Sequence, residues 1–148
     1  MIFLDATFFL RALTRSPLPE VQRMNLIASD LILRADRGEV TLTTSDAIIA
    51  EVAFVLTSKA HYNHGVPDAA GRLSTVLNLR GMRLRGKRVI PRALDLWASH
   101  PKLGFMDALA ASYARHTDVE LATFDTDFDE IPDITRWQPP VPPPFTTS

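Results

Sequence analysis

The sequence predicts an α/β protein with three layers, α/β/α, built around a central and mainly parallel β-sheet. Short apolar segments rich in β-branched residues alternate with longer segments that show helical spacing. The chain has 148 residues, 46% of them hydrophobic and 22% charged, which fits one globular domain with a sizeable core. No internal repeat or linker divides it, so we expect one domain over residues 1–138 and a proline-rich tail over 139–148.

The first elements are a strand and two helices. Residues 1–5, MIFLD, form an apolar run with β character, and residues 6–15 have helical spacing that ends at the prolines after them. Residues 20–37 predict a second helix, which Gly38 ends. The residues expected on its apolar face are Val21, Met24, Ile27, Ala28, Leu31 and Ala35.

The middle of the chain continues the alternation. Residues 40–44, VTLTT, are rich in β-branched residues and predict a strand. Ser45, or the threonine before it, can cap a helix over 46–59. Pro67 then opens a helix over about 68–79, because proline suits the first turn of a helix.

The C-terminal half holds two helices and two strands in this prediction. The expected elements are a short strand at 82–86, helices at 88–99 and 103–116, a strand at 119–125, a turn or short helix at 127–131, and a final strand at 134–137. The tail contains five of the eleven prolines, so we expect it to be extended and disordered.

The composition excludes several classes of protein. The chain has no cysteine, which excludes a disulfide scaffold and a thiolate metal site. The N-terminal segment carries Asp5 and Arg11 and lacks a basic start, so it does not resemble a signal peptide. No apolar run approaches the roughly 20 residues that span a bilayer. We therefore expect a cytoplasmic protein that does not contact membranes.

Charge is distributed unevenly, although the net charge is only −1. The chain has no acid between Asp68 and Asp95, and this stretch contains Arg72, Arg80, Arg83, Arg85, Lys87, Arg88 and Arg92. Residues 118–133 are acidic, with Asp118, Glu120, Asp125, Asp127, Asp129, Glu130 and Asp133. The basic stretch could bind a polyanion and the acidic one a metal ion. The alternative for the arginines is an ordinary solvated face.

Four acids leave apolar elements at positions where they could converge. Asp5 and Asp125 each end a predicted strand, and parallel strands end at the same sheet edge. Asp107 begins an alanine-rich helix, and Glu51 lies two turns into another among apolar neighbours. Converging carboxylates repel each other, and Mg²⁺ relieves that repulsion. The alternatives are helix caps for Asp5 and Asp107, a turn at Asp125, and an arginine partner or solvent for Glu51.

Four segments together resemble the PIN-domain ribonucleases, and among them the VapC-type toxins of toxin–antitoxin systems. The segments are MIFLDATFFL, TTSDAIIAEVAFVL, LGFMDALAASYAR and ELATFDTDFDEI, and their order and spacing also match. The resemblance implies an acidic quartet of Asp5, Glu51, Asp107 and Asp125 that holds Mg²⁺ or Mn²⁺, with Asp5, Asp107 and Asp125 as the first candidates for ligands. It also implies supporting roles for Thr7, Thr123 and Asp127, although the family commonly has asparagine at the position of Thr7.

The implied function is a Mg²⁺-dependent endoribonuclease toxin, a hydrolase that forms a homodimer and is inhibited by an antitoxin protein. The residues expected to contact RNA phosphates are Arg80, Arg83, Arg85, Lys87, Arg88 and Arg92. Thr7 motivates an alternative, a weakened domain that binds RNA or a protein without cleavage. A phosphatase or phosphotransferase is a third reading, but it requires a second aspartate two residues after Asp5 and a well-placed lysine.

Overall fold

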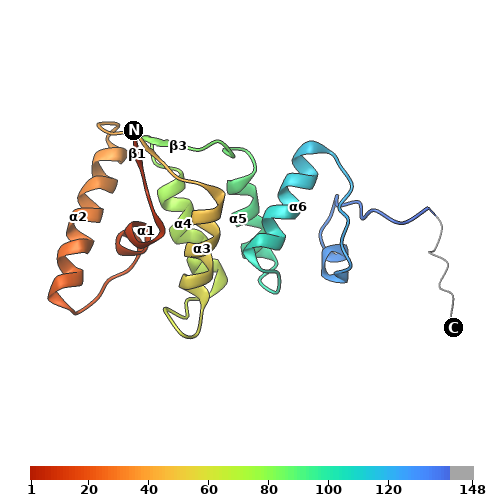
Figure 1. The fold of residues 1–148 in the computed structure, drawn as a ribbon, viewed down its shortest axis with the longest axis horizontal. Coiled ribbons are helices and arrows are strands. Elements are labelled where there is room, and N and C mark those ends of the chain that lie inside the picture. The colour runs from red at the N-terminus through yellow and green to blue at the C-terminus, as the bar shows by residue number, and fades with distance from the viewer. Residues whose placement is uncertain (141–148) are drawn as a thin grey trace, which may run out of the picture.

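The computed structural model describes residues 1–140, so most of the predicted proline-rich tail lies outside the described residues. The elements are β1 (Ile2–Phe3), α1 (Ala6–Leu13), α2 (Pro19–Asp36), β2 (Leu42–Thr43), α3 (Asp46–Thr57), α4 (Val66–Leu77), β3 (Met82–Arg83), α5 (Ile90–Ser99), α6 (Phe105–Thr117) and the 3₁₀ helix η1 (Thr126–Glu130). Figure 1 shows α1 and α2 at one end, α3 and α4 in the middle, and α5, α6 and η1 towards the other end.

The three strands form one parallel sheet in the order β1–β2–β3, which confirms the predicted α/β class. Phe3 aligns with Thr43 and Thr43 with Arg83, so these three residues share one face of the sheet. Each strand is only two residues long, shorter than predicted. β1 pairs with β2 alone, and its outer edge has no strand beside it within the described part of the chain.

Local sequence signals set the helix boundaries as predicted. Ser45 caps α3, with its Oγ accepting a hydrogen bond from the backbone N–H of Ile48 at 3.3 Å. Prolines occupy the first turns of three helices, Pro19 in α2, Pro67 in α4 and Pro91 in α5. Pro91 therefore lies in the opening turn of α5. Over residues 1–140, no helix combines the length and apolar character that crossing a bilayer requires.

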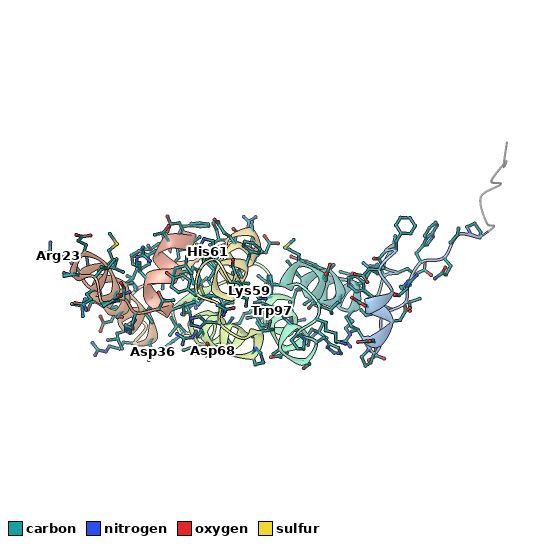
Figure 2. All side chains as sticks on the ribbon, turned by 90° about the horizontal axis from the view of Figure 1, so that it is seen from below. Arg23, Asp36, Lys59, His61, Asp68 and Trp97 are labelled. Carbon is teal, nitrogen blue, oxygen red and sulfur yellow. The ribbon has the colours of Figure 1, made fainter. Side chains whose placement is uncertain are left out.

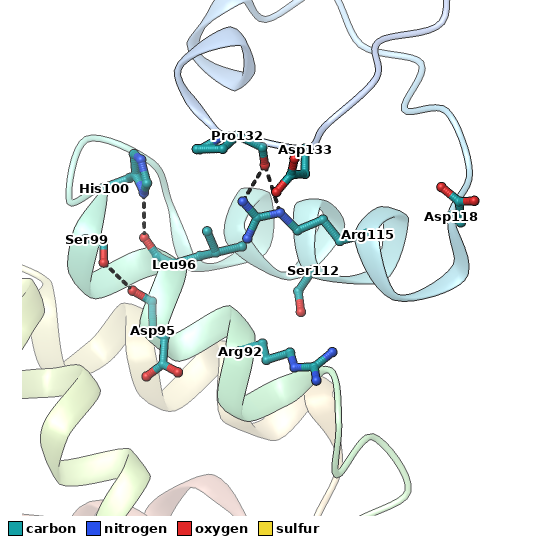
Figure 3. A pocket seen from close by; sticks show the side chains of 10 residues that line it. All are labelled: Arg92, Asp95, Leu96, Ser99, His100, Ser112, Arg115, Asp118, Pro132 and Asp133. Carbon is teal, nitrogen blue, oxygen red and sulfur yellow. Dashed lines mark hydrogen bonds between the residues drawn. The ribbon is translucent and has the colours of Figure 1, made fainter.

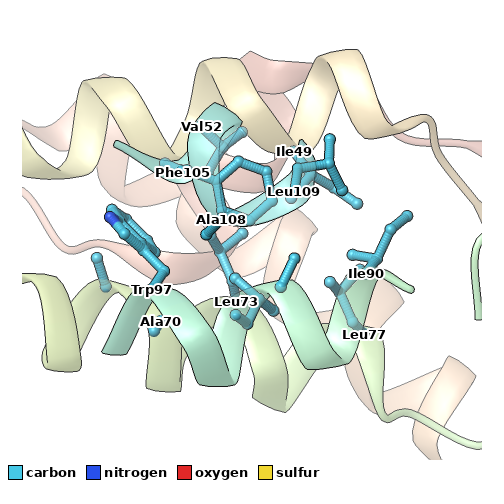
Figure 4. Packing of buried hydrophobic residues seen from close by; sticks show 14 of the residues in the cluster. Ile49, Val52, Ala70, Leu73, Leu77, Ile90, Trp97, Phe105, Ala108 and Leu109 are labelled. Atoms are coloured by element: carbon cyan, nitrogen blue, oxygen red, sulfur yellow. The ribbon is translucent and has the colours of Figure 1, made fainter. Parts of the chain in front are cut away.

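The hydrophobic core lies between the middle helices (Figure 4). Ile49 and Val52 of α3 are fully buried, and so is Leu73 of α4. Trp97 of α5 packs edge-on against Phe105 of α6, with ring centroids 5.6 Å apart. These contacts bury one stripe from each helix, which is the pattern that helical spacing predicts.

The apolar face predicted for α2 is only partly correct. Ala28 and Ala35 are buried, but Met24 and Ile27 are exposed and the polar Asn25 is buried in their place. The Asn25 amide donates hydrogen bonds to two backbone carbonyl oxygens at the end of α1, at 2.7 and 3.0 Å. α2 is the outermost helix, as its labelled residues Arg23 and Asp36 show in Figure 2. Only a narrow strip of it can therefore be buried against α1.

The predicted strands at 119–125 and 134–137 do not join the sheet. Leu121 and Arg136 form only an isolated parallel bridge in a segment beyond α6, residues 118–138, which we call the C-terminal arm (Figure 1). Phe128 and Ile131 anchor the arm in the core. Its backbone pairing is satisfied locally, because Leu121 donates to the carbonyl of residue 135 at 2.8 Å and residue 137 donates to Leu121 at 2.9 Å.

Candidate active site

Asp5 lies two residues after the end of β1, at the carboxyl end of the sheet, where parallel α/β folds take their ligands. It is also the N-cap of α1, because its Oδ1 accepts a hydrogen bond from the backbone N–H of Phe8 at 2.8 Å. The side chain is exposed. Within residues 1–140 its other carboxylate oxygen has no hydrogen-bond partner. Capping therefore leaves one oxygen of Asp5 available to a ligand.

Glu51 has apolar neighbours along its helix, but the structure leaves its side chain exposed. The buried stripe of α3 is formed by Ile49, Val52, Ala53 and Leu56, and Glu51 lies outside it, exposed beside the exposed Phe54. Both stripes fit helical spacing, so the local sequence alone could not choose between them. No arginine or lysine forms an ion pair with Glu51 among the described residues. The carboxylate therefore reaches solvent and stays free to bind.

Asp107 lies in the first turn of α6, but Gly104 is the N-cap, so the cap alternative for Asp107 is wrong. The side chain is half-buried. Its chain neighbour Met106 lines a cavity of about 350 Å³ together with Ala50 and Phe54 of α3. The N-terminus of α6 thus lies beside the part of α3 that carries Glu51.

Asp125 lies on the C-terminal arm and is exposed. It caps η1, with its Oδ1 accepting from the N–H of Asp127 at 2.8 Å, and its own N–H donates to Thr123 Oγ1 at 3.1 Å. Thr123 therefore supports the turn that holds Asp125. Asp127 is exposed and lines a cavity of about 190 Å³ that Lys102 also lines.

The four predicted acids do not make a metal site in this arrangement. Over residues 1–140, no three acidic or histidine side chains are grouped closely enough to hold an ion. Asp5 follows β1, whereas Asp125 lies on the arm beyond α6 (Figure 1). The predicted ligand set of Asp5, Asp107 and Asp125 therefore stays a prediction.

A cavity of about 680 Å³ lies between α5, α6 and the arm (Figure 3). Arg115 of α6 crosses it, and its guanidinium donates hydrogen bonds to the Pro132 carbonyl oxygen. Within the arm, Arg136 pairs with Asp129 at 3.1 Å. None of the four predicted acids lines this cavity. The hydrogen bonds from Arg115 to the Pro132 carbonyl oxygen thus hold the arm against α6.

The basic stretch is divided by the fold. Arg80 precedes β3 and its side chain packs over Gly38, at the amino end of the sheet. Arg83, Arg85 and Lys87 line a cavity of about 500 Å³ together with Met1 and Thr43. Arg92, by contrast, lines the cavity next to the arm. The seven basic residues between Asp68 and Asp95 are therefore not one continuous surface.

The sequence did not single out two residues near Arg83, Met1 and Phe3. Met1 lines the cavity of Arg83, and Phe3 shares the sheet face with Thr43 and Arg83. The alternation in MIFLD carried the signal, because residues 1, 3 and 5 of a strand point to the same side.

The parallel sheet, its helices and an aspartate at the carboxyl end of β1 define an α/β fold with a candidate ligand residue at the edge where such folds bind. The family model of the PIN domain matches residues 2–134, and the chain belongs to that family. PIN domains are generally metal-dependent nucleases, so family membership favours the nuclease reading over the phosphatase reading. Comparison with curated proteins found no match.

Proposed function

We propose that this chain is a divalent-metal-dependent endoribonuclease that hydrolyses RNA phosphodiester bonds. The observation that carries the proposal is the PIN domain match over residues 2–134, within which Asp5 stands at the carboxyl end of β1. Glu51 and Asp107 supply further carboxylates from neighbouring helices. Hard divalent ions such as Mg²⁺ or Mn²⁺ prefer oxygen ligands of this kind. Asp5, Asp107 and Asp125 are the proposed ligands.

The proposal includes one rearrangement, in which residues 119–124 pair with the free edge of β1. An unpaired edge leaves backbone N–H and C=O groups open to another strand. Ile2 of β1 is 42% exposed, and Val119 and Phe124 of the arm are also exposed. Pairing would bury apolar surface on both segments and would bring Asp125 to the strand end next to Asp5. We assign the active form to this paired arrangement.

A pair of cysteines tests the rearrangement cleanly, because the chain has no cysteine of its own. If Asp5 and Asp125 follow their strands in the same way, Ile2 faces Ala122. Paired strands lie about 4.8 Å apart, within the roughly 4.4–6.8 Å that a disulfide spans between Cα atoms. The Ile2→Cys/Ala122→Cys variant should form an intramolecular disulfide and keep its activity. Each single variant is the control, and an uncrosslinked monomer after full oxidation would contradict the pairing.

Cleavage itself is tested with purified protein and labelled RNA, in Mg²⁺, in Mn²⁺ and in EDTA. We expect metal-dependent fragments from the wild type and none from Asp5→Asn. Equal cleavage by both proteins, or cleavage in EDTA, would contradict the proposal. Mass spectrometry of the fragments then gives the position of the hydrolysed bond.

The second candidate function is that of a PIN domain that binds RNA or a protein without cleaving RNA. Thr7 at a position where asparagine is common, and the scattered acids of the described residues, favour it. The same assay separates the two functions. RNA binding with no cleavage in any metal would support the second and reject the first.

We propose further that the chain is the toxin of a toxin–antitoxin pair and acts as a homodimer. The outer side of α2 supports an interface, because Leu26, Ile27 and Leu33 are exposed there. Light scattering should give a dimer for the wild type and a monomer for Leu26→Ser/Ile27→Ser. Expression should arrest growth, and co-expression of a short open reading frame from just upstream should restore it. Unimpaired growth would contradict the toxin role.

A further inference from the structure

A groove of about 500 Å³ lies along β3 and the residues that follow it, and its lining is both basic and apolar. We call it the sheet-face groove, and its lining is Met1, Thr43, Met82, Arg83, Leu84, Arg85 and Lys87. Phe3 does not line the groove, but it shares a sheet face with two lining residues because it is in register with Thr43 and Arg83. Its aromatic side chain is 57% exposed, whereas Leu42 and Met82 in the neighbouring row are buried. The face thus presents an open aromatic ring on β1, two strand positions from Arg83 on β3.

The cations of this groove are not neutralised by the protein. Arg83, Arg85 and Lys87 are exposed, and none forms an ion pair across residues 1–140. The Arg83 Nη1 donates to the backbone carbonyls of Arg80 and Met82, at 2.8 and 3.1 Å, which fixes the guanidinium at the rim. Arg85 and Lys87 make no side-chain hydrogen bond within the described residues 1–140, so both side chains are available to an anion.

We propose that the sheet-face groove binds single-stranded RNA, with Arg83, Arg85 and Lys87 on phosphates and Phe3 stacked on a base. The inference rests on the proposed ribonuclease function and names the surface that holds the substrate. Single strands are bound by a basic groove together with exposed aromatic rings on which bases stack. Duplex RNA keeps its bases paired and stacked, so it cannot use Phe3 in this way.

The groove reaches the carboxyl edge of the sheet, which is the edge at which Asp5 lies. Arg85 lies two residues beyond Arg83, as Asp5 lies two residues beyond Phe3, so both are at the carboxyl edge. β1 and β3 are separated by two strand spacings, which is about 10 Å. RNA that lies across β3 and β2 therefore leads directly to Asp5.

Binding is measured by fluorescence anisotropy with a labelled single-stranded RNA in EDTA, which separates binding from cleavage. Arg85→Glu/Lys87→Glu should weaken binding at least about tenfold at low salt and flatten the salt dependence by about 0.7 per lost phosphate contact. The matched control is Arg23→Glu/Lys59→Glu, which makes the same change in charge at exposed residues outside the groove (Figure 2). It should bind far more tightly than the groove variant.

Phe3→Leu tests the stacking contact while keeping an apolar side chain. It should weaken binding about 5- to 100-fold with an unchanged salt slope, and duplex RNA should compete poorly. Circular dichroism verifies that each variant is folded. Equal losses in the groove and control variants, or wild-type affinity in both, would overturn the inference even if metal-dependent cleavage is found. Selective loss in the groove variants would support it even if no RNA is cut.

Discussion

Asp5 has a structural role that can be separated from its proposed role in catalysis. Its Oδ1 caps α1 through the N–H of Phe8 at 2.8 Å. Asparagine and serine are also good N-caps, whereas alanine is not. Asp5→Asn and Asp5→Ser therefore keep the cap but remove the negative carboxylate, and Asp5→Ala removes both.

The size of each effect follows from this geometry. Loss of the cap in Asp5→Ala should cost about 1 kcal/mol, which lowers the melting temperature of a chain of this length by about 2–4 °C. Asp5→Asn and Asp5→Ser should melt within about 1 °C of the wild type. If the carboxylate holds the ion, all three variants should lose about 100-fold or more in cleavage rate.

Thermal unfolding followed by circular dichroism and RNA cleavage in Mg²⁺ measure the two effects on the same samples. Wild-type cleavage by Asp5→Asn would refute the catalytic role of the carboxylate. An unchanged melting temperature for Asp5→Ala would refute the capping role. A parallel loss of stability and activity in all three variants would show that the activity change reports only on folding.

Three further changes test the fold. Leu73→Ala removes a fully buried side chain and should cost about 2–5 kcal/mol in urea unfolding. Asp68 accepts hydrogen bonds from His64 at 2.7 Å and Arg72 at 3.1 Å, which lower its pKa. Its stabilisation is therefore complete above the usual carboxyl pKa and lost as pH falls through the lowered value, so Asp68→Asn should reduce the acid sensitivity of the melting temperature. Gly81→Ala places a Cβ against two backbone carbonyl oxygens and should destabilise by about 1–3 kcal/mol.

The helices could be predicted closely because their signals are local. Proline in a first turn, or a hydroxyl that caps a backbone N–H as Ser45 does, acts within a few residues of the boundary. The first three predicted strands are at the right places but shorter than predicted, and the segments at 119–125 and 134–137 form only an isolated bridge instead of strands of the sheet. A strand exists only where a partner continues beside it, and that partner is distant in sequence.

The side of each element that is buried was harder to predict. Glu51 and Phe54 lie on a stripe with the same helical spacing as the buried Ile49 and Val52, so the pattern fits either side. On α2, Met24 is exposed although it fits the predicted face, because the outermost helix packs mainly against α1. Burial depends on packing partners that no local pattern specifies.

The sequence by itself determined the α/β class, the order of the elements and the presence of acids at the ends of apolar segments. Tertiary structure alone decided where those acids lie relative to one another and that the basic stretch divides around β3. The Arg115 contact with Pro132 and the buried Phe128 hold the arm against α6, and these contacts join residues far apart along the chain. Local capping and periodicity act over one or two helical turns, whereas such contacts depend on closing long loops and on which surfaces are left to pack.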